Sequence, residues 1–296
     1  MRPRTSRERI GDALRATLYR ASPLALVQYR YRRATGRWYN PRNTRTFDEK
    51  LLWLMLYWRH PLKSRCADKY AVRSYVEENG LSHLLSQLLG VYSSAEEIPF
   101  EELPDRFALK ATHGCNFNII CADKRRLDTA DAIRKLNGWL KVDISRLGAE
   151  LHYAAIPPRI VCEEFLEGRP GTAPDDYKVY CFHGKAHCTM ACTDRTDQGA
   201  NYDFYDLAWS RKLPYSKGSL KGGRDVPKPV GYEEMIRAAE ILAKPFPFVR
   251  VDFYSVNGRV VFGEMTFTPH GCIDTGYTDE AQAAMGQLIH LPDRLM

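Results

Sequence analysis

Residues 248–271 read FVRVDFYSVNGRVVFGEMTFTPHG. Two alternating apolar runs flank Asn257-Gly258, and an Asn-Gly pair between such runs is the strongest short-range signal for a β-hairpin. Each predicted strand carries one acid among valine, phenylalanine and tyrosine, Asp252 on the first and Glu264 on the second. Two buried carboxylates without a cation are unfavourable, and oxygen ligands on a short scaffold suit Mg²⁺ that is shared with substrate phosphates. The hairpin therefore predicts a metal site that serves nucleotide chemistry.

The strand register decides whether the two acids share one face of the sheet. A strict two-residue turn places Asp252 across from Gly263 and directs Glu264 to the opposite face. One extra residue in the loop, or a bulge at Gly258, places Asp252 directly across from Glu264. We predict the bulged register. The alternative is an edge hairpin in which one acid is solvated and the other is paired with an arginine of the hairpin.

The length and composition fit a globular protein. With 296 residues the chain is long enough for one large domain or two smaller ones. Its longest apolar run, residues 51–58, is far too short to cross a bilayer, and no signal-peptide pattern is evident at the N-terminus. The eight cysteines form no CxxC pair. We therefore expect reduced core cysteines in a cytoplasmic protein, and neither a disulfide framework nor a zinc site.

The net charge of +7 is concentrated near the N-terminus. Residues 1–45 contain twelve arginines, no lysine and two acids, which gives them +10 and leaves −3 for the remainder. With apolar residues at 10, 14 and 18, this segment either docks on an anionic membrane or polymer, or forms a solvated helix that covers a neighbouring lobe. No DNA-binding motif follows, which favours the solvated helix. Peripheral membrane contact is the secondary expectation, and no nucleic acid partner is expected.

The rest of the chain alternates predicted helices with strands. Residues 46–49, Thr-Phe-Asp-Glu, have the pattern of a helix N-cap, and Pro61 is predicted to stop the helix that follows. The polar segment 193–228 is predicted as one long functional loop. Further helices are predicted at 68–78, 129–140 and 232–242, and strands at 107–110, 119–121, 159–166, 177–182 and 185–191. This order predicts an α+β fold with two sheet lobes.

Five segments occur together in an order that is more specific than any one of them. They read ADKYAVRSYVEENG (67–80), FALKATHGCNFNIIC (107–121), IVCEEFLEG (160–168), DYKVYCFHGK (176–185), and RVDFY (250–254) with FGEMTFTPHG (262–271). Together they resemble the ATP-grasp superfamily, most closely its teichuronopeptide-biosynthesis (TupA-like) branch. The resemblance covers about residues 47–271. It implies an ATP-grasp fold, in which two α+β lobes clamp ATP with Mg²⁺.

The resemblance also suggests how the chain is divided. Residues 1–60 would be a basic helical N-terminal segment, residues 61–160 an N-terminal part with the phosphate-binding loop, and residues 161–296 a C-terminal lobe with the metal hairpin. In the middle part, Lys110, and Lys69 at the earlier lysine position, would place ammonium charges on the α- and β-phosphates. Backbone N–H groups of the next loop would close over the same phosphates. That loop consists of His113, Gly114, Cys115 and Asn116.

Two further segments are implied to bind the nucleotide. Glu163, Glu164, Phe165 and Leu166 resemble the hinge that reads the purine edge. Ordinary loop-facing acids are the alternative for the two glutamates. Asp176 is implied to face the ribose, and Lys178 the transferred phosphoryl group. The alternative is that Asp176 and Lys178 form a pair on a surface strand that contributes little to stability.

The hairpin supplies the implied metal and catalytic residues. Asp252 and Glu264 resemble the Mg²⁺ ligands, and Thr266 stands where many ATP-grasp enzymes have asparagine. Arg250, two residues before Asp252, can brace the γ-phosphoryl group or a substrate carboxylate with two hydrogen bonds. Arg195 is a second candidate for that role. His113 and His270 are not assigned as general bases, because a lone histidine in a turn is more often structural.

The implied activity is that of an ATP-dependent carboxylate–amine ligase. Such an enzyme forms an acyl phosphate and then lets an amine displace the phosphate, and it needs no protein nucleophile. The chain has neither a GxSxG elbow nor a P-loop motif, which agrees with this chemistry. The branch implies that an amino acid or small acid is joined to a cell-surface polysaccharide or its precursor. The alternatives are a phosphotransferase acting on a sugar hydroxyl and a non-catalytic module that binds nucleotide or an anionic polymer.

Overall fold

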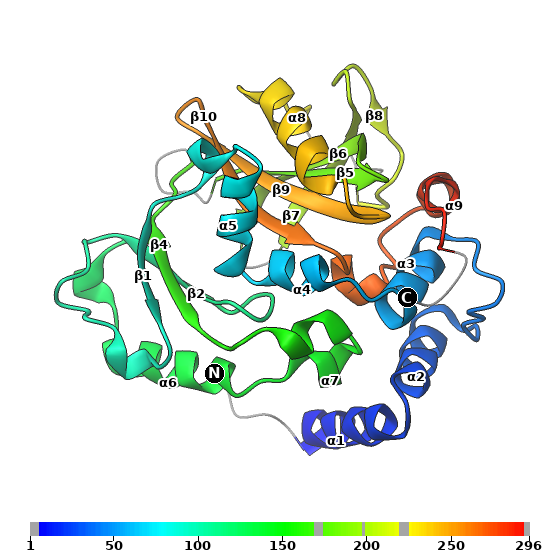
Figure 1. Cartoon of the computed structure of the whole chain (residues 1–296), viewed down its shortest axis with the longest axis horizontal. Helices are drawn as coiled ribbons and strands as arrows, with labels where there is room; N and C mark the ends of the chain where they lie inside the picture. Colours follow the sequence, from blue (N-terminus) through cyan, green and yellow to red (C-terminus); the bar gives the residue numbers. More distant parts are fainter. Residues whose placement is uncertain (1–5, 169–173, 197–198, 219–224, 293–296) are drawn as a thin grey trace. The chain divides into compact units, whose positions relative to one another are not determined.

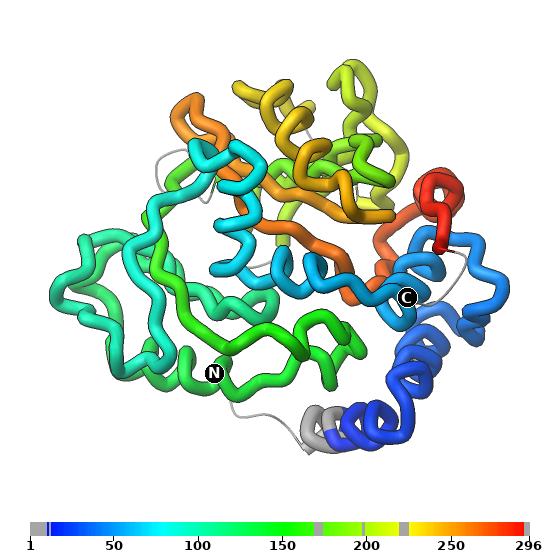
Figure 2. The backbone as a smooth tube through the Cα atoms, viewed as in Figure 1, coloured from blue at the N-terminus to red at the C-terminus, as the bar shows by residue number. Residues whose placement is uncertain are grey.

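The computed structural model describes residues 6–168, 174–196, 199–218 and 225–292 (Figures 1 and 2). It divides the chain into two compact units, each assembled from separate stretches of sequence. The first unit comprises the described parts of Met1–Arg30, His60–Arg73 and Ser86–Phe165. The second comprises those of Tyr31–Arg59, Ser74–Leu85 and Leu166–Met296. Residues 1–5 of the predicted basic segment and 219–224 of the predicted loop lie outside the described residues.

The first unit contains a four-stranded antiparallel sheet in the order β1-β4-β2-β3. Its strands are β1 (Leu88–Tyr92), β2 (Phe107–Ala111), β3 (Asn118–Cys121) and β4 (Ile160–Glu164). One face packs against a hydrophobic core that includes Leu109, Leu136 and Cys162. Because side chains alternate along a strand, Lys110 and Glu163 lie on the other face. This second face carries the predicted phosphate-binding lysine.

The helices of the first unit include the basic N-terminal segment. They are α1 (Ser6–Ala21), α4 (Pro61–Ala67), α6 (Thr129–Leu140) and α7 (Ile144–Gly148), with 3-10 turns η2 (Ala95–Glu97), η3 (Lys124–Arg126) and η4 (Leu151–Ala155). α2 (Pro23–Thr35) and α5 (Ala71–Glu78) begin in the first unit and end in the second. α6 contributes Leu136 to the core, and α1 packs against α7. The predicted helical character of the N-terminal segment is thus confirmed over its described residues.

The second unit is built on a six-stranded antiparallel sheet in the order β10-β9-β5-β6-β7-β8. The strands are β5 (Asp176–Phe182), β6 (Lys185–Thr196), β7 (Gly199–Asp206), β8 (Lys212–Leu213), β9 (Phe248–Val256) and β10 (Arg259–Thr266). Its helices and 3-10 turns are α3 (Phe47–Tyr57), η1 (Ser82–Leu84), α8 (Tyr232–Ala243), η6 (Pro269–Cys272) and α9 (Asp279–Leu288). The predicted fold class, α+β with two sheets, is confirmed.

The two faces of the six-stranded sheet have different surroundings. α8, drawn yellow in Figure 1, packs on one face against β5, β6 and β9. On the other face, Phe47 is fully buried in an aromatic cluster with Tyr180, Phe248 and Tyr277. α3, which carries Phe47, packs in turn against α9 and η6. The aromatic cluster fills one end of this face and leaves the other end to polar residues.

The hairpin of β9 and β10 confirms that the two acids face each other. Its turn is a strict two-residue turn at Asn257-Gly258, with φ values of 52° and 78°, as a type I′ turn requires. Pairing stays regular as far as Phe262, skips Gly263 and resumes with Glu264 directly across from Asp252. The predicted bulge at Gly258 is therefore wrong in its position.

Steric space explains why the bulge lies at Gly263. A Cβ atom at that position would come within 3.0 Å of the Asp252 carbonyl oxygen and 3.2 Å of the Tyr254 ring. Only a residue without a side chain fits so close to the neighbouring strand. Because Gly263 has no Cβ atom, β10 can take up one extra residue there. Glu264 then lies on the same face of the sheet as Asp252.

The start of α3 follows the predicted pattern. Thr46 Oγ1 accepts the N–H of Glu49 at 3.3 Å, and Glu49 Oε2 accepts the N–H of Thr46 at 3.1 Å, which together form a capping box. The role of Pro61 is different from the prediction, because it occupies the first turn of a new helix, α4. The next predicted helix, 68–78, begins only at Ala71.

The prediction of one long loop over residues 193–228 is wrong in its first half. β6 continues to Thr196, and β7 and β8 follow it as paired strands. Phe204 and Tyr205 of β7 are buried, while Tyr202 is 38% exposed. The polar composition of this segment reflects its exposed positions near the edge of the sheet. Composition alone does not reveal that the backbone of β7 pairs with β6.

The cysteines are buried as predicted, with one exception. All eight are free; seven are buried and Cys115 is exposed. Within the described part of the chain, no helix combines the length and apolarity that a membrane span needs.

Candidate functional site

Three strands of the second unit bring the predicted metal-binding and catalytic residues together. The register pairs Lys178 of β5 with Asp252 of β9, and Asp252 with Glu264 of β10. Side chains of residues paired in this way lie on the same face. Arg250 and Thr266 pair with each other two residues away along the same strands, so they share that face. The result is one polar surface that carries two acids and two cations.

Asp252 lies at the centre of this surface and is only 3% exposed. The Arg250 guanidinium donates to it twice at 2.7 Å, from Nε to Oδ1 and from Nη2 to Oδ2. Burial raises the pKa of Asp252, and the charges of Arg250 and Lys178 oppose that rise. The alternative to a metal site was an edge hairpin in which one acid pairs with an arginine. The structure shows that pairing for Asp252, but β9 is an interior strand and not an edge.

Lys178 connects Asp252 to a second buried acid. Its Nζ lies 2.6 Å from Asp252 Oδ2 and 2.5 Å from Asp176 Oδ1. Burial alone would lower the pKa of Lys178, but the charges of Asp252 and Asp176 raise it above its ordinary value. Lys178 is therefore a fixed positive charge in this surface.

Asp176 holds two cations. Its Oδ1 accepts from Lys178, and its Oδ2 accepts from Arg195 Nη2. Asp176 is 2% exposed, whereas the Arg195 side chain is 47% exposed. The structure thus places Arg195 within the predicted site, and it gives both oxygens of Asp176 to cations instead of leaving them for a ribose.

Glu264 is the accessible carboxylate of the surface. Its side chain is 38% exposed, compared with 4% for Asp252. Thr266 Oγ1 donates to Glu264 Oε1 at 3.3 Å and accepts from Arg250 Nη2 at 3.1 Å. The hydroxyl of Thr266 therefore orients Glu264 and Arg250 with respect to each other.

The donor set fits Mg²⁺ that is shared with phosphates. Glu264 offers an exposed carboxylate, and Asp252 Oδ1 has acceptor capacity beyond the bond from Arg250 Nε. Mg²⁺ ordinarily binds one or two protein carboxylates and completes its shell with water and phosphate oxygens. Among the described residues, no group of three or more His, Cys, Asp or Glu side chains is placed to hold a metal alone.

The first unit contains a separate buried ion cluster around Lys110. Its Nζ lies 2.6 Å from Glu163 Oε2, while Glu163 Oε1 accepts from Ser86 Oγ at 2.9 Å and from Arg73 Nη1 at 3.3 Å. Burial alone would raise the pKa of Glu163, but Lys110, Ser86 and Arg73 lower it. Glu163 is thus ionised and holds the Lys110 ammonium in place. Its side chain belongs to this cluster and does not extend from the predicted purine hinge.

Side chains of neighbouring residues support the predicted phosphate loop, residues 113–116. Lys69 Nζ donates to the Gly114 carbonyl oxygen at 2.7 Å. A Cβ atom on Gly114 would come within 2.9 Å of the Phe117 ring, which stacks on Trp139 at 5.6 Å between centroids. His113 is 4% exposed, its Nε2 is bonded to the Trp139 carbonyl, and burial lowers its pKa. Lys69 and His113 therefore support the loop.

The tip of this loop is exposed. Cys115 and Asn116 are the exposed residues of the predicted four, and Asn116 has a left-handed φ of 61°. The Lys124 ammonium donates to the carbonyl oxygens of Glu101 and Leu103 and not to this loop.

The predicted purine hinge continues from β4. The N–H of Glu164 donates to the Gln87 carbonyl at 3.0 Å, and Glu164 Oε1 accepts the N–H of Gln87 at 3.0 Å. The Glu164 N–H is therefore already used. Leu166 begins the last stretch of the second unit.

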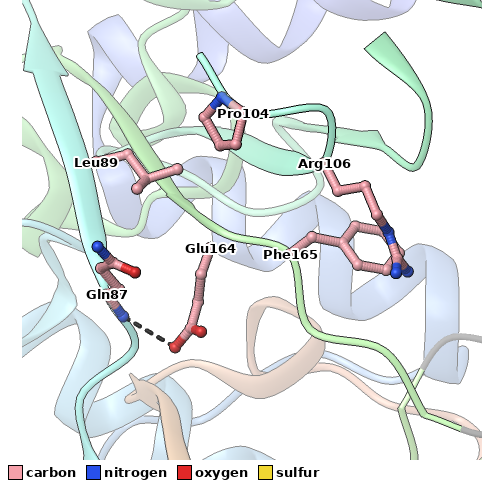
Figure 3. Close-up of a pocket in the computed structure, with 6 residues that line it drawn as sticks. All are labelled: Gln87, Leu89, Pro104, Arg106, Glu164 and Phe165. Atoms are coloured by element: carbon pink, nitrogen blue, oxygen red, sulfur yellow. Dashed lines mark hydrogen bonds between the residues drawn. The ribbon is translucent and has the colours of Figure 1, made fainter.

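A pocket of about 250 Å³ lies beside the hinge (Figure 3). Figure 3 shows the Arg106 guanidinium over the Phe165 ring, at 4.1 Å from its centroid. Glu164 alternates with Glu163 along β4, so this pocket and the Lys110–Glu163 pair are on opposite faces of the sheet. The residues that line the pocket are Gln87, Leu89, Pro104, Arg106, Glu164 and Phe165.

The arrangement of these segments agrees with a comparison to known families. The family described as TupA-like ATPgrasp matches residues 49–290, which is most of the chain. The chain belongs to this family. The predicted resemblance is thereby confirmed, and membership supports an ATP-dependent ligase reaction.

Solved structures show distant likenesses to this TupA-like ATP-grasp chain. A D-alanine–D-alanine ligase from Bacillus anthracis complexed with ATP is 13% identical, with 69% of this chain and 55% of that chain covered and a TM-score of 0.42. An L-amino acid ligase from Bacillus licheniformis is 15% identical, with 70% and 44% covered and a TM-score of 0.43. This chain thus spans about half the length of those two proteins. No curated protein matches it.

Sequence reasoning missed three residues of this TupA-like ATP-grasp site. Arg73 lies inside the quoted segment 67–80, but nothing in that segment indicates that its partner is Glu163. Ser86 lies outside every quoted segment and reaches Glu163 only because β1 pairs with β4. Gly263 was visible as a glycine within a strand, which is a known signal for a bulge.

Proposed function

We propose that this TupA-like ATP-grasp protein is a carboxylate–amine ligase that works through an acyl phosphate. The observation that carries the proposal is the polar surface of β5, β9 and β10. There Asp252 holds Arg250 and Lys178, and Glu264 remains accessible beside them. Fixed cations next to accessible carboxylate oxygen suit a reaction in which negative charge develops on phosphoryl and acyl oxygens.

Residues of the metal hairpin and of the four-stranded sheet have different roles in this proposal. Glu264 and Asp252 would hold Mg²⁺, with Thr266 orienting Glu264, and the ion would supply positive charge that offsets the charge of the phosphates. Lys110, oriented by Glu163, binds the α- and β-phosphates together with backbone N–H groups of the loop 113–116. Because the N–H of Glu164 is bonded to Gln87, the hinge reads the purine through Leu166.

The reaction has two steps. A carboxylate oxygen of the acid substrate attacks the γ-phosphorus, the bond from that phosphorus to the β-phosphate oxygen breaks, and ADP leaves. An amine nitrogen then attacks the acyl carbon, expels inorganic phosphate and loses a proton as the amide forms. Lys178 and the Nη1 edge of Arg250 stabilise the phosphoryl oxygens in both steps, while Arg195 positions the acid.

For substrates, we propose that an amino acid or small acid is joined to a cell-surface polysaccharide or its precursor on the cytoplasmic side. The resemblance of the chain to the teichuronopeptide-biosynthesis branch supports this proposal. The amine and the acid are to be found by screening pools of amino acids and glycan acids.

The test measures Mg²⁺-dependent ADP formation by the wild type, Asp252→Asn and Glu264→Gln with those pools. We expect one pool to stimulate turnover, and each substitution to lower it by at least a hundredfold, since each removes a metal-facing charge. Asp131→Asn, which changes a partly exposed acid in α6, is the matched control and should keep activity.

Hydroxylamine then distinguishes the reaction classes. A ligase in the presence of its acid gives an acyl hydroxamate, because hydroxylamine intercepts the acyl phosphate. A phosphotransferase acting on a sugar hydroxyl gives ADP and a phosphorylated sugar without hydroxamate. Failure of the wild type to bind or turn over MgATP with every pool would leave only the non-catalytic binding module.

A further inference from the structure

Residues 32–45 of the second unit form an exposed basic surface around one tryptophan. Five arginine side chains in this stretch are exposed, and Trp38 among them is 67% exposed. No other large apolar side chain among the described residues has so high an exposed fraction. We call this surface the basic–Trp38 patch. It consists of Arg32, Arg33, Arg37, Trp38, Arg42 and Arg45.

Buried groups fix the backbone beneath the patch. Tyr31 and Tyr39 are each 2% exposed, and their rings lie 5.8 Å apart. Both reach Glu49 in α3, since the Tyr31 hydroxyl donates to Glu49 Oε1 at 2.9 Å and that of Tyr39 donates to the Glu49 carbonyl at 3.3 Å. The arginines and Trp38 are therefore presented on an anchored platform, which lowers the entropy lost when they bind a partner.

The two acids that follow the patch in the chain are turned largely inward, and Glu49 also interacts electrostatically with Arg37. Asp48 is 6% exposed. The carboxylate of Glu49 accepts the backbone N–H groups of Arg45 and Thr46 and the Tyr31 hydroxyl, so it serves the interior of the turn. The outward side thus displays arginines and the indole of Trp38.

The Arg32 guanidinium lies 5.5 Å from the Trp38 ring centroid. This contact keeps the indole beside a cation instead of burying it in the protein core. A partner that suits both groups must offer negative charge and a partly apolar layer at the same place.

We propose that the basic–Trp38 patch binds the headgroup region of an anionic lipid bilayer. Tryptophan prefers that region because its ring is apolar and its N–H is polar, and arginines are attracted to anionic headgroups. A soluble polyanion would pair with the arginines but leave the Trp38 indole in water. The proposal does not depend on the catalytic activity of the protein.

Flotation of the full chain with vesicles tests this binding. Each arginine close to an anionic surface contributes roughly a fivefold factor to partitioning. The triple variant Arg37→Gln, Arg42→Gln, Arg45→Gln should therefore partition on the order of a hundredfold more weakly into vesicles with 30% phosphatidylglycerol. The corresponding Arg→Lys triple should keep most of the binding, which separates lost charge from lost folding. Wild type should not float with pure phosphatidylcholine, and 500 mM salt should release it.

A matched triple controls for net charge. Arg125→Gln, Arg134→Gln, Arg146→Gln removes the same charge from exposed positions of the first unit, where the side chains are 85%, 70% and 63% exposed. Its flotation should equal that of the wild type. Equal loss in both triples would overturn the proposal, because binding would then follow net charge and not the patch.

Brominated lipid tests the role of the indole. Fluorescence of the wild type should be quenched in anionic brominated vesicles, and Trp38→Phe should lose most of that quenching. Unchanged quenching in the variant would contradict insertion of Trp38. Failure of the wild type to float, with retention on heparin or single-stranded DNA, would overturn the proposal in favour of a soluble polyanion.

Discussion

At the scale of single residues, the carboxylate of Glu163 determines where the charge of Lys110 lies. The lysine ammonium is 2.6 Å from one oxygen of Glu163, while Arg73 and Ser86 hold the other. A lysine side chain is flexible, and a buried counter-charge restricts it to one position. In the proposed site, Glu163 would therefore act on a bound phosphate through Lys110.

Replacing Glu163 with glutamine should separate these effects. The variant keeps the size of the side chain but leaves Lys110 and Arg73 without a buried anion, so we expect a loss of about 2 kcal/mol in the free energy of unfolding. We also expect KM for ATP to rise more than kcat falls, because the misplaced charge contacts phosphates that do not react. Urea denaturation and steady-state kinetics measure the two effects. The exposed Glu101→Gln is the control, and a variant with wild-type KM would refute this role for Glu163.

The identities of these residues were easier to predict than their partners. The sequence marks Lys110, Asp252 and Glu264 because a charged residue stands out within an apolar strand. The contact of Lys110 with Glu163 joins residues 53 positions apart and depends on the pairing of β2 with β4. A pattern within one segment contains no information about such pairing.

At the scale of elements, the bulge at Gly263 decides whether β10 presents Glu264 beside Asp252. Without the extra residue, a strand that starts from the same two-residue turn would place Gly263 across from Asp252. Glu264 would then point to the face covered by α8. One glycine thus determines the composition of the polar surface.

Substitution and deletion at Gly263 should therefore have opposite results. Gly263→Val favours a regular strand and places a side chain against the Asp252 carbonyl, so Glu264 should leave the polar face. We expect Mg²⁺-dependent ATP binding to weaken at least tenfold, as measured by calorimetry with and without Mg²⁺. Deletion of Gly263 brings Glu264 into register without a bulge and should retain Mg²⁺ dependence. Equal binding by the valine variant and the wild type would contradict the assignment.

The turn was predicted at the right residues and the bulge was not, for a physical reason. Asn257 and Gly258 adopt positive φ, which is a local property of their side chains. The bulge depends on the distance between Gly263 and the backbone of β9, which is a tertiary property. β7 was missed for the same reason, because its pairing with β6 stabilises a segment whose composition resembles that of a loop.

At the scale of the whole molecule, the free energy of unfolding should depend on pH through Asp48. This residue in the first turn of α3 is 6% exposed, and burial raises its pKa to about 7. The folded state then binds more protons than the unfolded state between about pH 4 and pH 7. Its contribution to stability is fully present below about pH 4 and is lost as pH rises through 7.

Asp48→Asn removes this titration and leaves an oxygen to accept the N–H of Asp274. The difference in unfolding free energy, variant minus wild type, should rise by up to about 1.4 kcal/mol per pH unit between pH 5 and pH 7. Urea midpoints at several pH values measure it. Using the difference removes the opposite contribution of His113, His183 and His187, whose pKa values burial lowers. Parallel curves for the two proteins would show that Asp48 is ionised in the folded state.

The interleaving of the two units has a consequence for synthesis on the ribosome. The chain passes between the units five times, and the second unit takes its first stretch from Tyr31–Arg59 and its last from Leu166–Met296. The interior strand β9 and its hairpin partner β10 emerge only near the end of translation. During that interval α3, with its apolar residues Leu51, Leu52 and Met55, has no sheet to cover and is a natural client for a chaperone. A truncated transcript would therefore yield α3 without the sheet against which Phe47 packs.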